Sequence, residues 1–342
     1  MSIQTILNTI RQNSSAQYQE RIPEATKNNL SEIGTALLDF APSRNEFLDA
    51  LVNRIAFVQV SNRRFKNPLS ILKKGTKPYG LDIEDIYTNP VSAQTYDGTN
   101  IADMLKITKP DTKTIYYRTN RQDKYCVSIT IPQLKKAFTS EGEFKKFYNS
   151  IMTALYSGDE LDEFLLMKNL VSDAIKNNKL VTMEVDYTGD EETSKEFIKL
   201  VKTVSKNFKF PSHDYNGYNK LNAEGITSKQ IVPAKTWTPE ENQIILIRTD
   251  VSSCTSVEVL AQAFNMDEVE FKKRKIEVDN FGDTDTLAVV CDEALFQVYD
   301  DYYGMEDFKN GSNLVTNFWL HHWQTLSLSL WANAVAFKQK TA

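Results

Sequence analysis

The chain has 342 residues, which is enough for a substantial core and, at roughly 150 residues each, for about two domains. Apolar residues (41%) and charged residues (25%) occur in the proportions of a folded protein, which excludes disordered and fibrous classes. The net charge of −5 gives no sign of a dedicated nucleic-acid binder.

The cysteines and the N-terminal segment bear on where the protein is found. The chain has three cysteines, Cys126, Cys254 and Cys291. Their odd number and wide separation in the sequence argue against a secreted disulfide framework and favour reduced thiols. The start of the chain lacks a basic segment followed by an apolar core, and no window approaches about 18 consecutive apolar residues. We therefore expect neither an export signal nor a membrane span.

Short amphipathic segments separated by polar stretches make up residues 1–57. Apolar residues recur at helical spacing from Ile3 to Ile10, and the segment NEFLDALVNRIAF repeats that pattern. Between them, Pro23 and the segment ATKNNLSEIG interrupt any single long helix. The pattern predicts an arm composed of short helices.

Turn-forming residues recur through residues 58–132 and separate short β-branched segments. The best strand pair consists of KTIYYRT and KYCVSITI, on either side of Asn120–Asp123. In the second segment Tyr125, Val127 and Ile129 share one face. We predict that the two segments pair as an extended hairpin arm.

The same region contains a basic cluster. It can be a solvated loop surface, or it can be a salt-sensitive contact to an acidic neighbouring subunit. The candidate inter-subunit contact residues are Arg63, Arg64, Lys66, Lys73, Lys74 and Lys77.

Residues 143–178 have the strongest helical pattern in the chain. One apolar stripe runs from Phe144 to Leu155 and resumes after Gly158 from Phe164 to Ile175, which predicts a long spine helix with at most a bend at the glycine. The acidic residues of this segment are predicted to form its solvated side. They are Asp159, Glu160, Asp162 and Glu163.

The remaining segments alternate between helix and strand. LVTMEVDY, QIILIRT, KIEVDNF, TLAVVCD and ALFQVYDD are strand candidates, and SKEFIKLVKTVSKNFKF and SVEVLAQAFNM are helix candidates. A strongly apolar stretch with three tryptophans, LVTNFWLHHWQTLSLSLWANAVAF, follows them. This mixture predicts an α+β fold.

Recognisable catalytic motifs are absent from the sequence: it contains no phosphate-binding glycine loop, no nucleophile elbow and no zinc motif. His321 and His322 are adjacent, so their side chains diverge on a regular element, and we interpret them as part of a packed aromatic patch. Asp300 and Asp301 fit a solvated acidic loop. A metal-dependent hydrolase that uses Asp300, Asp301 and either histidine is the weaker alternative. We expect no catalytic, cofactor-binding or metal-binding residues, and no cofactor.

Several segments, in the same order from the arm to the last residues, resemble the major capsid proteins of the phi 29 group of podoviruses. They are NLSEIGTALL, NEFLDALVNRIAFV, NPLSILKKGTKPYGLDIEDIYT, TNRQDKYCVSI, SIMTALYSGDELDEFLLMKNLV, EVLAQAFNM and HHWQTLSLSLWANAVAF. The resemblance covers essentially the whole chain.

The resemblance implies a Hong Kong 97-type phage capsid fold. Residues 1–57 would then form the N-terminal arm and residues 58–132 the extended loop that reaches a neighbouring subunit. Residues 133–214 and 311–342 would form the peripheral domain with the spine helix, and residues 215–310 the axial domain. The best-known relative carries an additional immunoglobulin-like domain, which we expect this chain to lack.

The function implied is that of a major capsid protein. Copies of the chain would form pentamers and hexamers of an icosahedral or prolate head that encloses double-stranded DNA without sequence preference. A scaffolding protein and a portal would be partners in assembly, which would take place in the host bacterial cytoplasm, with no membrane contact. A structural adaptor outside the shell is the alternative within the virion.

Overall fold

The computed structural model of the chain describes residues 3–26, 29–55, 65–78, 81–95, 106–139, 141–223, 231–254 and 274–340. The chain forms two compact units, here called unit 1 and unit 2. Unit 1 contains Met1–Asn67, Arg121–Glu163 and Asp300–Trp323, and unit 2 contains Pro68–Asn120, Phe164–Tyr299 and Gln324–Ala342. Both units are therefore assembled from segments that lie far apart in the sequence.

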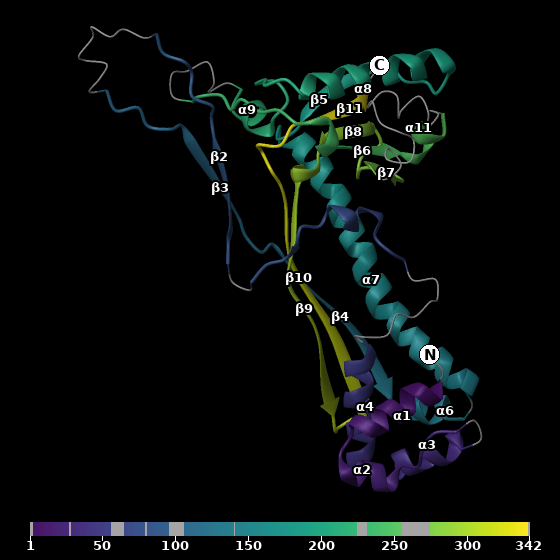
Figure 1. The fold of residues 1–342 in the computed structure, drawn as a ribbon. Helices are drawn as coiled ribbons and strands as arrows, with labels where there is room; N and C mark the ends of the chain where they lie inside the picture. Colours follow the sequence, from purple (N-terminus) through teal and green to yellow (C-terminus); the bar gives the residue numbers. More distant parts are fainter. Residues whose placement is uncertain are drawn as a thin grey trace. The chain divides into compact units, whose positions relative to one another are not determined.

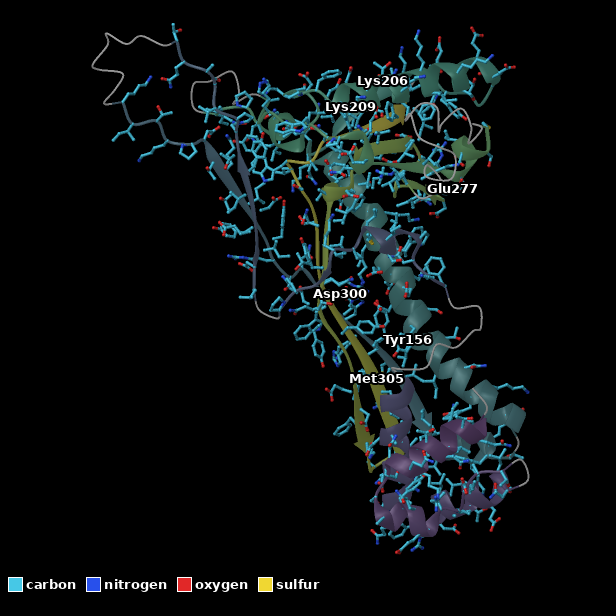
Figure 2. All side chains as sticks on the ribbon, viewed as in Figure 1. Tyr156, Lys206, Lys209, Glu277, Asp300 and Met305 are labelled. Carbon is cyan, nitrogen blue, oxygen red and sulfur yellow. The ribbon has the colours of Figure 1, made fainter. Side chains whose placement is uncertain are left out.

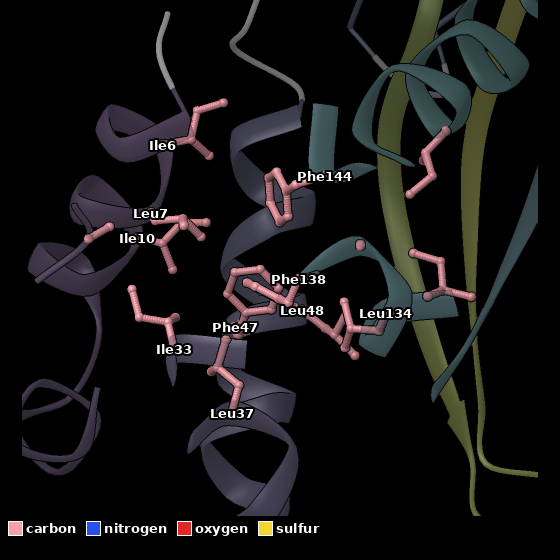
Figure 3. Close-up of a cluster of buried hydrophobic side chains, with 14 of the residues drawn as sticks. Ile6, Leu7, Ile10, Ile33, Leu37, Phe47, Leu48, Leu134, Phe138 and Phe144 are labelled. Atoms are coloured by element: carbon pink, nitrogen blue, oxygen red, sulfur yellow. The ribbon is translucent and has the colours of Figure 1, made fainter. Parts of the chain in front are cut away.

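Unit 1 is built on a group of short helices with a shared aromatic core (Figures 1 and 3). The ring of Phe138 lies 5.4 Å from that of Phe47 and 5.3 Å from that of Phe144. A Cβ atom at Gly34 would lie 2.3 Å from the Cβ of Phe138, so only glycine allows this close approach. The helices are α1 (Ile3–Asn13), α2 (Ala16–Arg21), α3 (Leu30–Asp39), α4 (Ala41–Ile55) and α6 (Ile131–Ala137). The predicted series of short helices is confirmed.

The long helix predicted from the apolar stripe is also confirmed. It is α7 (Glu141–Lys176), which continues through Gly158 and contributes residues to both units. A four-stranded sheet with the order β1-β9-β10-β4 consists of β1 (Gly75–Thr76), β9 (Phe296–Asn310), β10 (Val315–Leu328) and β4 (Arg121–Thr130). Along β4, Ile129 is buried whereas Cys126 and Ser128 are exposed, as the alternation predicts.

Unit 2 contains a five-stranded sheet with the order β5-β11-β8-β6-β7. Its strands are β5 (Val181–Val185), β11 (Ala334–Gln339), β8 (Thr286–Asp292), β6 (Gln243–Arg248) and β7 (Lys275–Val278). Helix α8 (Glu191–Phe208) lies on one face of this sheet (Figure 1) and packs Phe197 and Val201 against it. Met167 and Val171 of α7 pack on the other face. Burial on both faces explains why β6 and β8 read as continuous apolar runs.

This sheet crosses the predicted boundary between the peripheral and axial domains. Strands β5 and β11 come from the two ranges predicted to be peripheral, whereas β6, β7 and β8 come from residues 215–310. Conversely, β9 lies within residues 215–310 but is next to β10 in the other sheet. The predicted boundary at residue 214 therefore assigns hydrogen-bonded strands of one sheet to two different domains.

The predicted pairing of KTIYYRT with KYCVSITI is wrong, although both strands exist. The first forms β3 (Thr112–Tyr117), which pairs antiparallel with β2 (Ile83–Thr88), and the second forms β4 beside β10. Asn120 gives the physical reason. Its backbone N–H donates to the carbonyl of Gln324 (3.1 Å), and its side chain bonds both backbone groups of Leu326 (2.8 Å each). Asn120 is thus bound to β10 and does not act as a hairpin turn.

Short elements complete the described parts of the chain. They are the 3₁₀ turns Pro68–Leu72, Glu240–Asn242 and Glu293–Leu295 and the helices α9 (Gly217–Leu221) and α11 (Thr249–Cys254). The predicted helix SVEVLAQAFNM lies outside the described residues. Among the helices that the structure describes, none combines the length and the apolar run needed to cross a bilayer.

Replacing Asn120 by alanine should lower the free energy of unfolding by about 1–3 kcal/mol, because backbone groups of Leu326 lose both side-chain partners. Urea unfolding of the unassembled protein measures the change. Asn177→Ala is the matched control: its amide also bonds a carbonyl, that of Asp173, but the side chain is exposed, so a change within about 0.5 kcal/mol is expected. Equal losses in both variants would contradict the assigned role of Asn120.

Candidate functional site: a buried charge cluster in unit 1

Charged side chains from four elements meet inside unit 1. Strand β4 begins with Arg121, α7 supplies Asp159 and Glu163, β9 supplies Asp300, and β10 supplies His322. We call these five residues the charge cluster. Asp300 is labelled on β9 in Figure 2. Asp159 and Glu163 lie four residues apart and therefore project from the same side of α7.

Asp159 is at the centre of the charge cluster. Its Oδ1 accepts a hydrogen bond from Nη2 of Arg121 (2.9 Å) and lies 2.6 Å from Nδ1 of His322. The side chains of Arg121, Asp159 and His322 are no more than 5% exposed. Low exposure leaves the pairs little screened by water, so the loss of one partner would leave a buried charge uncompensated.

Arg121 makes further contacts along β4. Its Nε donates to Asp123 (2.7 Å) and its Nη2 to the hydroxyl of Tyr125 (2.8 Å). Tyr125 in turn donates to a carboxylate oxygen of Asp162 (2.9 Å). Burial raises the pKa of Tyr125, so this residue acts as a neutral hydroxyl donor. One guanidinium therefore connects the start of β4 with one side of α7.

His322 faces a carboxylate with each of its ring nitrogens. Nδ1 lies beside Asp159, and Nε2 lies 3.1 Å from Oδ1 of Asp300. The ring of Tyr303 meets the imidazole edge-on, with 4.8 Å between the centroids. Burial alone would lower the pKa of His322, but the hydrogen bonds to Asp159 and Asp300 outweigh burial and raise the pKa above its usual value. The surroundings of the ring therefore favour a positive charge on it.

Glu163 completes the charge cluster beside His322 and Asp300. One carboxylate oxygen of Glu163 accepts a hydrogen bond from the side chain of Asn67 (2.8 Å). Glu163, Asp300 and His322 each offer one ligand atom, and these three atoms lie within 4.8 Å of one another. Residues of this kind and spacing could hold a metal ion.

Two sequence predictions about these acidic residues are wrong. Asp159 (3% exposed) and Glu163 (4% exposed) do not belong to a solvated side of α7, whereas Asp162 is exposed as predicted and Glu160 is half-buried. Asp300 and Asp301 lie inside β9 and not in an acidic loop, and Asp301 is buried. For Asp159, Glu163 and Asp300, a cation or a hydrogen-bond donor from another part of the chain makes burial possible, and such a partner cannot be seen locally.

The predicted divergence of the adjacent histidines is consistent with strand geometry. His322 is buried and His321 is half-buried. The rings that pack nearby include Tyr302 against Trp323 and Phe308 against Trp319, in line with an aromatic patch. The sequence did not indicate that His322 contacts Asp159 of α7 and Asp300 of β9.

Comparison with known proteins identifies the kind of protein that carries this cluster. A family profile of the Phi29-like phage major capsid proteins matches residues 7–338. The chain belongs to this family of phage major capsid proteins. It is 33% identical to the major capsid protein of Bacillus phage PZA over 336 residues, which covers 97% of the chain and 72% of the relative. It is 29% identical to the major capsid protein of Streptococcus phage Cp-1, with 96% of the chain and 92% of that relative covered.

Solved structures confirm the predicted Hong Kong 97-type fold of this Phi29-like capsid protein. A chain in the capsid structure of Staphylococcus phage Andhra matches with a TM-score of 0.65 at 13% identity, covering 83% of this chain and 88% of that one. A chain of native bacteriophage P68 matches with a TM-score of 0.60 at 13% identity, with 83% and 87% covered. The protein is thus a major capsid protein of a tailed phage, a virion component that oligomerises into the shell.

The six basic residues predicted as subunit contacts do not form one described patch of this capsid protein. Arg63 and Arg64 lie outside the described residues, and Lys66 is exposed in unit 1. The other three belong to unit 2, where Lys73 is half-buried, Lys74 donates to the carbonyl of Glu293 (3.0 Å) and Lys77 is buried. Their role in subunit contacts remains a prediction.

In this capsid protein the β2–β3 hairpin is fixed to the rest of unit 2 by one face. Asp85 accepts hydrogen bonds from Tyr117 (2.8 Å) and from Ser329 (2.9 Å). The ring of Tyr87 stacks on Trp331, with 5.3 Å between the centroids. These contacts hold the hairpin to the segment between β10 and β11.

The opposite face of the hairpin is open. We define the open hairpin face as Glu84, Ile86, Thr114 and Tyr116, whose side chains alternate with the anchored ones. Ile86 is 57% exposed and Tyr116 is 59% exposed. Large apolar side chains held outward on a fixed strand pair are typical of a surface that is covered in an assembly.

Proposed function

We propose that the chain assembles as pentamers and hexamers into the icosahedral or prolate head of a tailed bacteriophage, which encloses double-stranded DNA. The open hairpin face is the observation that carries this proposal. A strand pair anchored on one side, with Ile86 and Tyr116 exposed on the other, suits a contact that each subunit makes with its neighbour. A repeated contact of this kind, related by closed symmetry, builds a shell without any second protein in the contact.

The four capsid regions are part of the proposal, with two adjustments. Residues 1–57 are the arm, and residues 58–132 the extended loop, which includes the open hairpin face. Because of the shared sheet, we assign β5, β11 and α8 to the axial domain (215–310), although their residues fall within the peripheral ranges (133–214 and 311–342). We assign β9 to the peripheral domain, although its residues fall within the axial range. Hydrogen-bonded strands then stay in one domain.

The proposal extends to partners and to chemistry. A scaffolding protein and a portal take part in assembly in the host bacterial cytoplasm, and the packaged DNA is contacted without sequence preference. The role is structural and not catalytic.

Of the basic residues, Lys66, Lys73 and Lys74 are retained as candidate subunit contacts, whereas the buried Lys77 is the weakest candidate of those that the structure describes.

Co-expression with the scaffolding protein of the same phage, followed by electron microscopy of the products, tests the proposed function. Closed shells of uniform size are the expected result, and the subunit should be present in many copies per particle. Discrete monomers under all assembly conditions would overturn the proposal. A particle that contains only a few copies would instead support the adaptor alternative.

A further inference from the structure

Three elements of unit 1 bring metal-binding side chains to one point. Glu163 comes from α7, Asp300 from β9 and His322 from β10. One ligand atom of each lies within 4.8 Å of the other two. Glu163 and His322 are buried in unit 1, and the side chain of Asp300 is 23% exposed. Asp300 is thus the most exposed of the three side chains.

We propose that Glu163, Asp300 and His322 bind a divalent cation, with zinc as the best-suited ion. Zinc binds imidazole nitrogen and carboxylate oxygen at about 2.0–2.2 Å in tetrahedral geometry, which places neighbouring ligand atoms about 3.4 Å apart. Nε2 of His322 and Oδ1 of Asp300 are 3.1 Å apart, so a small outward shift accommodates the ion. Magnesium and calcium prefer sites made of oxygen alone, which the imidazole disfavours.

The orientation of His322 supports this proposal independently of the distances among the three ligands. Its Nδ1 lies 2.6 Å from Asp159, a carboxylate outside the ligand set. When Nδ1 carries the ring proton and donates a hydrogen bond to Asp159, Nε2 keeps its lone pair on the side of Asp300. Metal-binding histidines in proteins are usually held by such an outer carboxylate, which fixes the ring and strengthens the ligand.

The charges of the cluster also favour a cation. Asp159, Glu163 and Asp300 bring three negative charges, and Arg121 brings one positive charge. A divalent cation next to Glu163 and Asp300 would be attracted by both carboxylates in a site with little water. Protonation of His322 is the alternative way to balance the charge, and it predicts no metal.

The bound ion would connect α7 with β9 and β10 inside the subunit, so the role inferred is structural. This site differs from the expectation drawn from sequence, which included no metal ligands. It also differs from the hydrolase alternative, since Asp301 and His321 are not among the ligands. The inference does not depend on the proposed contacts in the shell.

Isothermal titration of zinc into the chelator-treated, full-length, unassembled protein tests the site. One zinc per chain is expected for the wild-type protein, with a rise in melting temperature. Glu163→Gln and His322→Asn should abolish binding, and Asp159→Asn should weaken it by about 10–100-fold. His321→Asn is the matched control, because it changes the neighbouring histidine, and it should bind zinc like the wild type.

A second measurement guards against variants that fail to fold. Cobalt(II) added to the wild-type protein should give the visible absorption of a four-coordinate ion, and one equivalent of zinc should displace it. No stoichiometric zinc binding and no cobalt spectrum would overturn the proposal in favour of a protonated His322. Equal binding by His322→Asn and His321→Asn would overturn it as well, because the ion would then be held elsewhere.

Discussion

Replacing Arg121 by methionine should lower the free energy of unfolding by about 3–5 kcal/mol, one of the largest effects expected for a single substitution in this chain. The guanidinium is buried and contacts Asp123, Tyr125 and Asp159. Methionine fills a similar volume but leaves Asp159 in a site with little water and with one cationic partner fewer. Urea unfolding of the unassembled protein measures the loss.

Arg118→Met is the matched control for this prediction. Arg118 donates to Asp82 (2.8 Å), but its side chain is 78% exposed, so removing the pair should change the stability by less than about 1 kcal/mol. Arg121→Lys should give an intermediate loss, because the ammonium keeps the charge but cannot reproduce the planar set of contacts. Similar small losses for Arg118→Met and Arg121→Met would show that the buried network contributes little to stability.

The charge cluster shows where local sequence reasoning fails. Arg121 lies in the run Asn120–Asp123, where polar residues indicate a turn, and its partner Asp159 is 38 residues away. His322 is 163 residues from Asp159. A turn residue and a buried network residue look alike until the distant partner is known, because only the partner makes burial of the charge favourable.

One signal in the sequence did point toward the cluster. Ile151, Leu155, Asp159 and Glu163 follow one another at intervals of four residues, and all four are at most 4% exposed. The acidic residues thus continue the buried stripe of α7 and do not leave it. A stripe that changes from apolar to acidic without changing face predicts a buried charged site on that helix.

The order of elements could be predicted because each depends on its own periodicity. The spacing of Phe144 and Leu155 predicts a helix, and the alternation from Tyr125 to Ile129 predicts a strand, both as observed. Strand partners depend on distant residues. The contact between Asn120 and Leu326 decides that β4 lies beside β10, and no local pattern around residue 120 contains that information.

A charge at Ile86 should prevent shell assembly without unfolding the subunit. Ile86 is exposed in the isolated chain, so Ile86→Asp should lower the free energy of unfolding by only about 1 kcal/mol, the usual span of strand preference. If a neighbouring subunit covers the open hairpin face, burying an unpaired carboxylate there costs at least several kcal/mol per contact. Every subunit carries the change, so the yield of shells seen by electron microscopy should fall below detection.

Ile86→Val separates this effect from any general sensitivity of the hairpin. Valine keeps the apolar contact and the preference for a strand, so assembly should stay close to that of the wild type. Circular dichroism and urea unfolding of the unassembled variants confirm that β2 and β3 still pair. Normal shells from Ile86→Asp would mean that the open hairpin face remains in water after assembly. The contact between subunits would then have to be sought on another surface, with the exposed Lys66 as the next position to change.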